Sequence, residues 1–256
     1  MLDQKKIHTK LNRDGMCIIN NFLSEKKCDH YVGLLKNIIK KRIKKKKYVG
    51  QKNSIILYNF FLEDSRLLNL IYDKHIDKIL KKTIDNDYVL TTATARNQYL
   101  SNLEKVNLKN SNASGQKWHT DNRYINNQAI KPSLSYLVIF ALEDFTKENG
   151  STLYIKKSHK LKKKVKINKN SKINILTAKK GSLIFMDSNL SHKAGSPTEV
   201  SRWSIFNIYS PWFVKPYFQF NKLNYKTKLN KKVKKLLHFN STPPLNYNYG
   251  IKTLLK

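Results

Sequence analysis

Few features of this sequence suit a secreted or a membrane-spanning protein. The 256 residues include two cysteines, Cys17 and Cys28, too few for a disulfide framework, and we expect both to be buried free thiols. The N-terminal segment M-L-D-Q-K-K-I-H-T-K contains no apolar stretch of the kind found in a secretory signal. The longest charge-free apolar run, residues 132–142, is too short to span a bilayer. We therefore expect a soluble, cytoplasmic protein.

Acidic residues are also scarce. The chain has 17 Asp and Glu against 50 Lys and Arg, a formal net charge of +33. Such an excess suits an anionic partner, for example nucleic acid, a membrane surface or a phosphate-bearing substrate. It also arises from a bias in composition, and the basic residues here are spread along the whole chain. We favour the bias, so contact with nucleic acid or membrane stays an open alternative, and no oligomeric state is predicted.

The sequence predicts a single domain whose first part, residues 1–87, is a helical layer. Residues 15–23 read as a short strand, and Ser24 is a good N-cap for the helix that follows. Apolar residues recur in that helix at spacings of three and four: Val32, Leu35, Ile38, Ile39 and Ile43. Its other face is rich in lysine, so it could lie on an anionic membrane or pack on the protein's own core, which we favour. A second helical stretch is expected at 64–82.

Short β-rich segments separated by turns begin at Tyr88 and continue to about residue 220. We expect strands near 88–99, 116–119, 133–141, 151–155, 173–177, 182–186, 190–193 and 202–209. Eight short strands preceded by helices favour a closed or double-sheet β architecture over a βαβ repeat. The remaining segment, 221–256, is predicted to be a basic C-terminal helix and tail.

The stretch W-H-T-D contains a histidine and an aspartate two residues apart, His119 and Asp121. In an extended backbone, residues two apart point to the same side, so one imidazole nitrogen and one carboxylate oxygen can reach a common point. These are two of the three ligands of the 2-His-1-carboxylate triad that holds non-haem Fe(II). Taken alone, the pair is weak support, since a polar surface turn can contain the same two residues.

A third ligand must come from a distal histidine, and the β-rich region offers His159 and His192. His159 lies in the lysine-dense turn K-K-S-H-K, where a metal ion would meet strong positive charge. His192 follows a strongly apolar strand and a short turn. The ends of early and late strands meet at the mouth of a closed β architecture, so His192 is the better candidate.

Arg202, ten residues after His192, opens the apolar strand R-W-S-I-F-N-I-Y-S. A buried arginine is costly unless it pairs with an anion, and a dicarboxylate would suit its forked guanidinium. Ser204 faces the same side and could donate a second hydrogen bond. The alternative is an arginine that Glu199 or backbone carbonyls satisfy.

Three motifs together resemble the phytanoyl-CoA dioxygenase family of Fe(II)/2-oxoglutarate oxygenases. They are W-H-T-D, then E-N-G-S-T-L-Y-I-K-K-S-H-K, then S-H-K-A-G-S-P-T-E-V-S-R-W-S. The family typically has W-H-x-D, an N-G segment that ends in P-G-S-H, and an arginine about ten residues beyond the distal histidine. One departure is Lys156-Lys157, where Pro-Gly is usual. The resemblance implies a double-stranded β-helix (a jelly roll, cupin-like) as the core at 88–220, with the N-terminal helices packed on one sheet.

The resemblance also implies a role for each site residue. His119, Asp121 and His192 would hold Fe(II), and Arg202 with Ser204 would hold the distal carboxylate of 2-oxoglutarate. Gln98 is a further expected cosubstrate contact. Thr152 and Trp118 are others, for which lining the core is the alternative. Arg123 could meet an anionic substrate or face solvent.

The implied activity is hydroxylation of a C–H bond with Fe(II), 2-oxoglutarate and O2 and with release of succinate and CO2. An intact Asp121 points to hydroxylation, because halogenating relatives carry a small residue there. The expected substrate is a small molecule or a carrier-linked acyl group, and an anionic substrate is one option. Two alternatives stay open, an oxygenase acting on nucleic acid and an inactive jelly-roll binding module.

Overall fold

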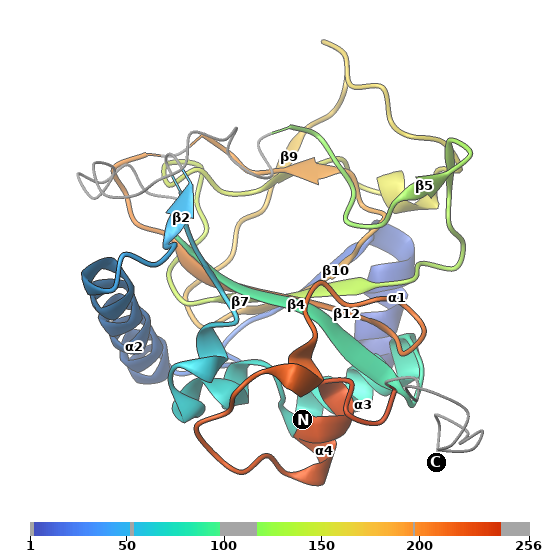
Figure 1. The fold of residues 1–256 in the computed structure, drawn as a ribbon. Coiled ribbons are helices and arrows are strands. Elements are labelled where there is room, and N and C mark those ends of the chain that lie inside the picture. Colours follow the sequence, from blue (N-terminus) through green and yellow to red (C-terminus); the bar gives the residue numbers. More distant parts are fainter. Residues whose placement is uncertain (1–2, 52–53, 98–116, 197, 242–256) are drawn as a thin grey trace, which may run out of the picture.

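The structure, a computed structural model, describes residues 3–51, 54–97, 117–196 and 198–241. It is a mixed α/β protein built on one large antiparallel sheet (Figure 1). The strands of this sheet, in spatial order, are β1 (Met16–Ile19), β10 (Leu183–Asp187), β7 (Tyr136–Ala141), β12 (Trp203–Pro211), β4 (Tyr88–Asn97), β3 (Ser54–Tyr58) and β2 (Gly50–Gln51). A smaller sheet has the order β11 (His192–Lys193), β8 (Leu153–Tyr154) and β9 (Asn174–Ile175). A hairpin of β5 (Tyr124–Ile125) and β6 (Gln128–Ala129) completes the set.

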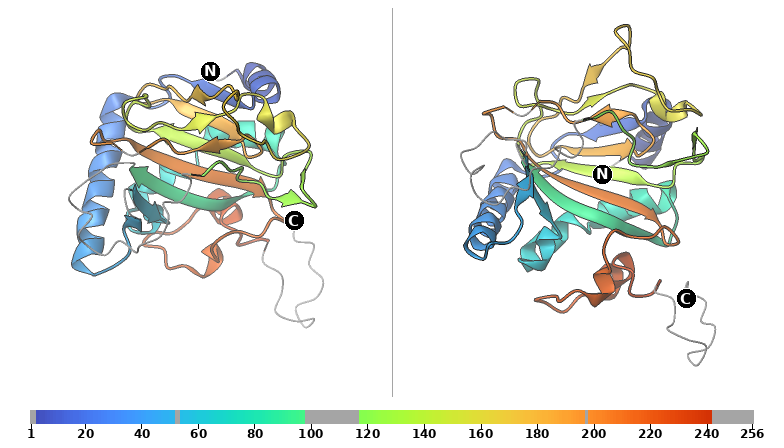
Figure 2. Two further views of the ribbon diagram at one scale, coloured as in Figure 1. Left: turned by 90° about the horizontal axis from the view of Figure 1, so that it is seen from above. Right: turned by 45° about the horizontal axis from the view of Figure 1, so that its top comes forward.

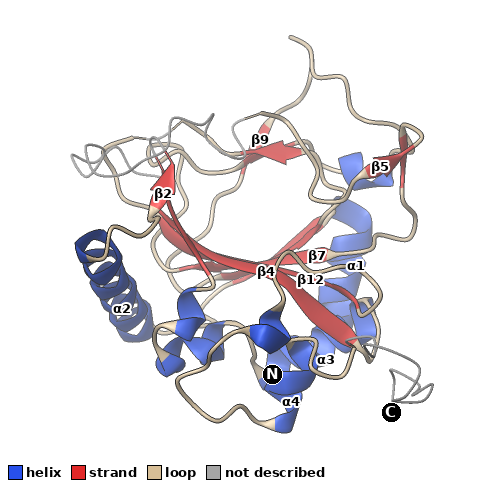
Figure 3. Cartoon of the chain, in the orientation of Figure 1, coloured by secondary structure: helices blue, strands red, loops and turns tan. Residues whose placement is uncertain are grey.

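Helices cover one face of the large sheet, and the smaller sheet lies over the other (Figures 1 and 3). The α-helices are α1 (Gln4–Asp14), α2 (Glu25–Lys44), α3 (Lys74–Thr83) and α4 (Lys231–Leu236). Short 3-10 helices connect the elements: η1 (Phe60–Leu62), η2 (Ser65–Leu70), η4 (Ser158–Lys160) and η5 (Phe220–Lys222). The tilted view in Figure 2 shows the red C-terminal segment and the yellow strands on opposite sides of the large sheet.

The alternation of side chains along the central strands produces this layering. On β7, Val138 and Phe140 belong to the core cluster that the helices cover, whereas Leu137 and Ile139 belong to the cluster beneath the smaller sheet. All four are buried, which is why the strand reads as a continuous apolar run. A sheet covered on both faces leaves room for a ligand only where the cover is incomplete, and this is where the candidate site lies.

The basic helix predicted after Ser24 is α2. The Ser24 side chain accepts a hydrogen bond from the backbone N–H of Lys27, the expected N-cap. Val32, Leu35 and Ile38 are buried in the core cluster, so the helix packs on its own protein as we favoured. Within the described ranges, no helix has both the length and the apolar character needed to cross a membrane.

The helical stretch predicted at 64–82 consists of two helices, η2 and α3. Asp73 has an extended backbone, and its carboxylate accepts hydrogen bonds from the N–H groups of His75 and Ile76. It therefore begins α3 as a new helix, after η2 has ended at Leu70. The C-terminal helix is also shorter than the basic segment that predicted it, since α4 covers Lys231–Leu236.

The segment 1–87 contributes strands as well as helices to the fold. β1 pairs with β10, and β3 pairs with β4, so both extend the large sheet. The strand predicted near 116–119 is reduced, within the described residues, to an isolated bridge at His119. At Lys157, where the family usually has glycine, the backbone is left-handed with φ of 64°. A lysine adopts this conformation at a cost that glycine avoids.

Truncation of a side chain that joins the sheet to the helices should be costly. Phe140 is 1% exposed, so Phe140→Ala is expected to lower the free energy of unfolding by about 3–5 kcal/mol, as the removed ring leaves a cavity. Phe213, 63% exposed, is the matched control, and its truncation should change stability by about 0.5 kcal/mol or less. Denaturant unfolding measures both. Equal losses for the two variants would contradict the layering.

Candidate metal centre and its cleft

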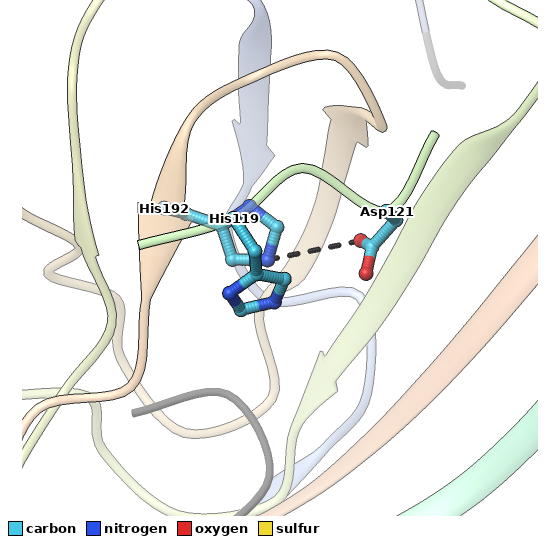
Figure 4. A group of neighbouring side chains, drawn as sticks. All are labelled: His119, Asp121 and His192. Atoms are coloured by element: carbon cyan, nitrogen blue, oxygen red, sulfur yellow. Dashed lines mark ion pairs between the residues drawn. The ribbon is translucent and has the colours of Figure 1, made fainter. Parts of the chain in front are cut away.

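Two backbone hydrogen bonds bring His119 and His192 together. The N–H of His119 donates to the carbonyl of His192, and the N–H of His192 donates to the carbonyl of His119, each at 2.9 Å. This antiparallel bridge places the two rings side by side, with centroids 4.4 Å apart. Asp121 follows two residues later and directs its carboxylate at the same point (Figure 4).

One potential ligand atom from each of His119, Asp121 and His192 lies within 4.8 Å of the others. The Nε2 atom of His192 is 3.7 Å from Oδ2 of Asp121. Among the residues described, this is the only group of three or more such side chains that could hold one metal ion. His159, the other histidine considered, is buried elsewhere with its Nε2 3.2 Å from the carbonyl oxygen of Asn12.

Both imidazoles are oriented by the chain itself. Nδ1 of His119 lies 2.7 Å from the carbonyl oxygen of Lys117, and Nδ1 of His192 lies 2.8 Å from that of Leu190. A carbonyl oxygen can only accept, so each Nδ1 carries a proton and each Nε2 keeps its lone pair for a ligand. Burial lowers the pKa of His192, although the nearby Asp121 carboxylate acts in the opposite direction, and a lowered pKa favours the neutral ring. A neutral imidazole is the form that binds metal.

The environment of the Asp121 carboxylate indicates whether these residues fit a cation. Its Oδ2 atom is buried and has no hydrogen-bond partner in the described part of the chain. A buried carboxylate oxygen without a partner is costly. A divalent cation between the three side chains would supply that missing partner, so the donor set fits a metal of the 2-His-1-carboxylate class.

Arg202 lies deep in the same region and is 3% exposed. Its Nε and Nη2 donate to the carbonyls of Asn149 and Gly150, at 3.3 and 3.2 Å, and the guanidinium lies 4.5 Å from the centre of the Phe145 ring. Its Nη1 is buried and has no partner within the described ranges. Burial, and next the charge of Arg96, lowers the pKa of Arg202 to about 10, so it stays protonated at neutral pH.

The local backbone explains how Arg202 reaches these carbonyls. Gly150 has φ of 65°, and a Cβ atom there would lie 2.1 Å from the carbonyl oxygen of Ser196. Only glycine allows the two segments to approach this closely. Backbone carbonyls thus satisfy part of the guanidinium, as one alternative held, whereas Glu199 is exposed and no ion pair joins it to Arg202 in the described structure.

A cleft of about 350 Å³ connects the metal-binding triad to Arg202. Its lining residues are Tyr58, Thr92, Thr94, Arg96, His119, Thr120, Asp121, Arg123, Leu137, Thr152, His192, Ala194, Arg202, Phe206, Ile208 and Tyr217. Of the predicted cosubstrate contacts, Thr152 and Arg202 line the cleft. Ser204 is fully buried, and its hydroxyl donates to the carbonyl of Arg96 at 3.4 Å. Gln98 lies outside the described residues.

Sequence reasoning missed a row of cleft residues on β4. Thr92, Thr94 and Arg96 alternate with Ala93 and Ala95, so one face of the strand lines the cleft and the other enters the core. The period-two pattern was a readable signal. It did not reveal which of the two faces would point at the metal-binding residues. Tyr58 and Tyr217, which come from other parts of the chain, offered no comparable signal.

Loss of one imidazole should remove metal binding. His192→Ala is expected to weaken binding of Fe(II) or Ni(II) at least about tenfold, because two ligands remain where three converge. His30, an exposed histidine on α2, provides the matched control, and His30→Ala should bind metal like the wild type. Calorimetric titration of metal into each protein gives the affinities. Full metal affinity in His192→Ala would exclude this triad as the site.

Comparison with known proteins agrees with this geometry. The sequence matches the family described as phytanoyl-CoA dioxygenase (PhyH) over residues 11–202. A search of curated proteins found no match.

Solved structures share the fold at low sequence identity. HygX from Streptomyces hygroscopicus, with nickel and 2-oxoglutarate bound, is 13% identical with a TM-score of 0.65, covering 89% of this chain and 93% of its own. The epimerase SnoN, in complex with Fe3+, alpha ketoglutarate and nogalamycin RO, is 13% identical with a TM-score of 0.63, covering 89% and 92%. AviO1 from Streptomyces viridochromogenes Tue57 is 15% identical with a TM-score of 0.63, covering 84% and 98%.

The family match covers most of the chain and contains the triad, Arg202 and most of the cleft-lining residues. The relation to the solved structures concerns the fold, and the family match carries the chemistry. The chain belongs to the phytanoyl-CoA dioxygenase family, and it is an Fe(II)- and 2-oxoglutarate-dependent enzyme.

Proposed function

We propose that the protein hydroxylates a C–H bond of a small-molecule or carrier-linked acyl substrate. One atom of O2 would enter the product as a hydroxyl group. The other would enter succinate, as 2-oxoglutarate loses CO2. The observation that carries the proposal is the pair of unpartnered buried groups in one cleft, Oδ2 of Asp121 and Nη1 of Arg202. One suits a cation and the other a carboxylate, which are the two components of this chemistry.

The triad would hold the metal on one side only. His119, Asp121 and His192 converge on a common point in the cleft, and a triad of this kind would leave the remaining coordination positions for the cosubstrate and oxygen. When bound, Fe(II) supplies the activation of oxygen that no side chain can perform. The protein holds the two imidazoles in one tautomer through their Nδ1 contacts and keeps the Oδ2 atom of Asp121 buried.

Arg202 would bind the distal carboxylate of 2-oxoglutarate. Its Nη1 has no other partner among the described residues, and its burial strengthens a contact with an anion. Thr152 lines the same cleft and would add a hydroxyl donor. Ser204 and Gln98 stay predicted contacts, and Ser204 would have to turn from the carbonyl of Arg96 to reach the cosubstrate.

The architecture we propose for the core is the double-stranded β-helix. The apolar cluster between the two sheets, which includes Leu137, Ile139 and Phe145, supports this, since it fills the interior that such a fold encloses. The metal site would then lie at the mouth, where β11 of the smaller sheet carries His192.

A cleft of about 350 Å³ is in the range for one small ligand, which supports a small-molecule substrate. Among proteins of the same fold, SnoN and HygX were solved with nogalamycin RO and hygromycin B. We extend only the class of substrate, a small organic molecule, to this protein.

Spectroscopy tests the cosubstrate site without a known substrate. Under anaerobic conditions, Fe(II) with 2-oxoglutarate is expected to give a visible charge-transfer band. Arg202→Gln should raise the 2-oxoglutarate concentration needed for that band by about 10-fold to 100-fold, as charged hydrogen bonds contribute about 1.5–3 kcal/mol. Arg66→Gln removes an exposed arginine that pairs with Asp64 and should leave the titration unchanged. A wild type without the band would refute the proposed function.

Product analysis tests the reaction type. A screen of candidate metabolites should find compounds that stimulate succinate formation, and mass spectrometry should show a product heavier than its substrate by one oxygen atom. His192→Ala should lose this stimulation, since it lacks one of the three converging ligands. Stimulated succinate formation with a product of unchanged mass would contradict hydroxylation.

A further inference from the structure

Two arginines line the cleft in addition to Arg202. Arg96 is the last cleft-lining residue of β4, and Arg123 lies two residues beyond Asp121. Neither has a role in the proposed binding of metal and 2-oxoglutarate. Arg96 is half-buried and Arg123 is exposed, which places one inside the cleft and the other at its mouth.

The environment of Arg96 leaves most of its guanidinium unused. Its Nε donates to Oγ1 of Thr94 at 3.2 Å, and the guanidinium lies 5.1 Å from the centre of the Phe206 ring. No carboxylate forms an ion pair with Arg96 or Arg123 in the described parts of the chain. A half-buried, cleft-lining arginine held by one hydroxyl and one ring keeps further N–H donors that an anion in the cleft could receive.

The charges in the cleft do not balance when its proposed ligands are bound. Asp121 is the one acidic side chain among the lining residues that the structure describes, against three arginines. A divalent metal and the dianion 2-oxoglutarate cancel one another. Asp121 offsets one arginine, and Glu143, outside the lining residues, offsets part of the charge of Arg202, so a net positive charge remains. In a cleft partly withdrawn from water, that excess favours a further anion.

Like charges inside the cleft reinforce this excess. Arg96 is close enough to Arg202 to lower the pKa of that arginine, after the larger effect of burial. The backbone of Arg96 pairs with Ser204 of β12, two residues from Arg202, and Arg96 lines the same cleft as the metal-binding triad. An anionic group bound to Arg96 would therefore stand in the cleft that holds the reacting centre.

We propose that the substrate carries a carboxylate or a phosphate ester, and that Arg96 binds this group inside the cleft with Arg123 assisting at the mouth. Tyr58 and Tyr217 line the same cleft and offer hydroxyl donors. This inference rests on the proposed function and narrows its substrate to anions. Arg96 and Arg123 act as specificity-determining residues. They orient the substrate, because fixing its anionic end limits which carbon can approach the metal.

Binding of small anions tests the inference directly. The protein is loaded with Ni(II) and 2-oxoglutarate, and acetate or methyl phosphate is titrated at constant ionic strength in a calorimeter. At least one of the two should bind the wild type, and Arg96→Gln should weaken that binding about tenfold or more, as a charge-assisted contact is lost. Arg123→Gln should act in the same direction with a smaller factor, because Arg123 is exposed.

Arg66→Gln is the matched control, since it removes the same charge outside the cleft and should bind both anions like the wild type. Stronger binding of acetate assigns a carboxylate, and stronger binding of methyl phosphate assigns a phosphate ester. Equal affinities in the wild type and Arg96→Gln, or no binding of either anion to the wild type, would overturn the proposal.

A second measurement separates Arg96 from the cosubstrate site. Arg96→Gln should keep the 2-oxoglutarate affinity of the wild type within a few-fold, whereas Arg202→Gln should not. A loss as large as that of Arg202→Gln would place Arg96 on 2-oxoglutarate and refute the substrate role. Failure of the proposed function differs from failure of this inference. The first shows as a missing charge-transfer band in the wild type, and the second shows in the anion titration, which does not depend on that band.

Discussion

The antiparallel bridge between His119 and His192 is the interaction on which the candidate site depends. Two backbone hydrogen bonds join segments that are far apart in the sequence, and they set the distance between the two imidazoles before any metal binds. Backbone contacts of this kind are insensitive to side-chain rotation. Asp121 then needs only the two-residue period of an extended chain to face the same point. The triad is thus preorganised, because the backbone bridge fixes the relative positions of the two histidines.

The same region contains charged groups that the protein alone does not satisfy. Oδ2 of Asp121 and Nη1 of Arg202 are buried without partners in the described structure, and the cleft has an excess of arginine. Such groups reduce stability in the absence of ligands, and the large apolar clusters on both faces of the sheet offset that cost. A cation and anions would supply the partners that these groups lack, so the stability lost in the free protein is regained as binding free energy.

Several elements could be predicted from the sequence for clear reasons. β7 is a continuous apolar run because both of its faces are buried. In β12, part of the strand alternates between buried and half-buried residues, as the sequence pattern predicts. The cap at Ser24 follows from local hydrogen bonding. In contrast, the break at Asp73 was missed, because a cap within a helical pattern competes with periodicity, and the outcome depends on how the neighbouring helices pack.

By itself, the sequence determined the composition of the site: the His-x-Asp pair, a distal histidine after a strand, and an arginine ten residues later. These residues are recognised by their spacing in the sequence. In an extended backbone, residues two apart point to the same side, so the spacing also predicts the direction of their side chains. The local context of the two histidines favoured His192, but only the tertiary structure placed it beside His119 and decided which face of β4 meets the metal-binding residues. Both depend on strand pairing between distant segments, which local patterns do not encode. For that reason Arg96 became visible only once the sheet had placed it in the cleft.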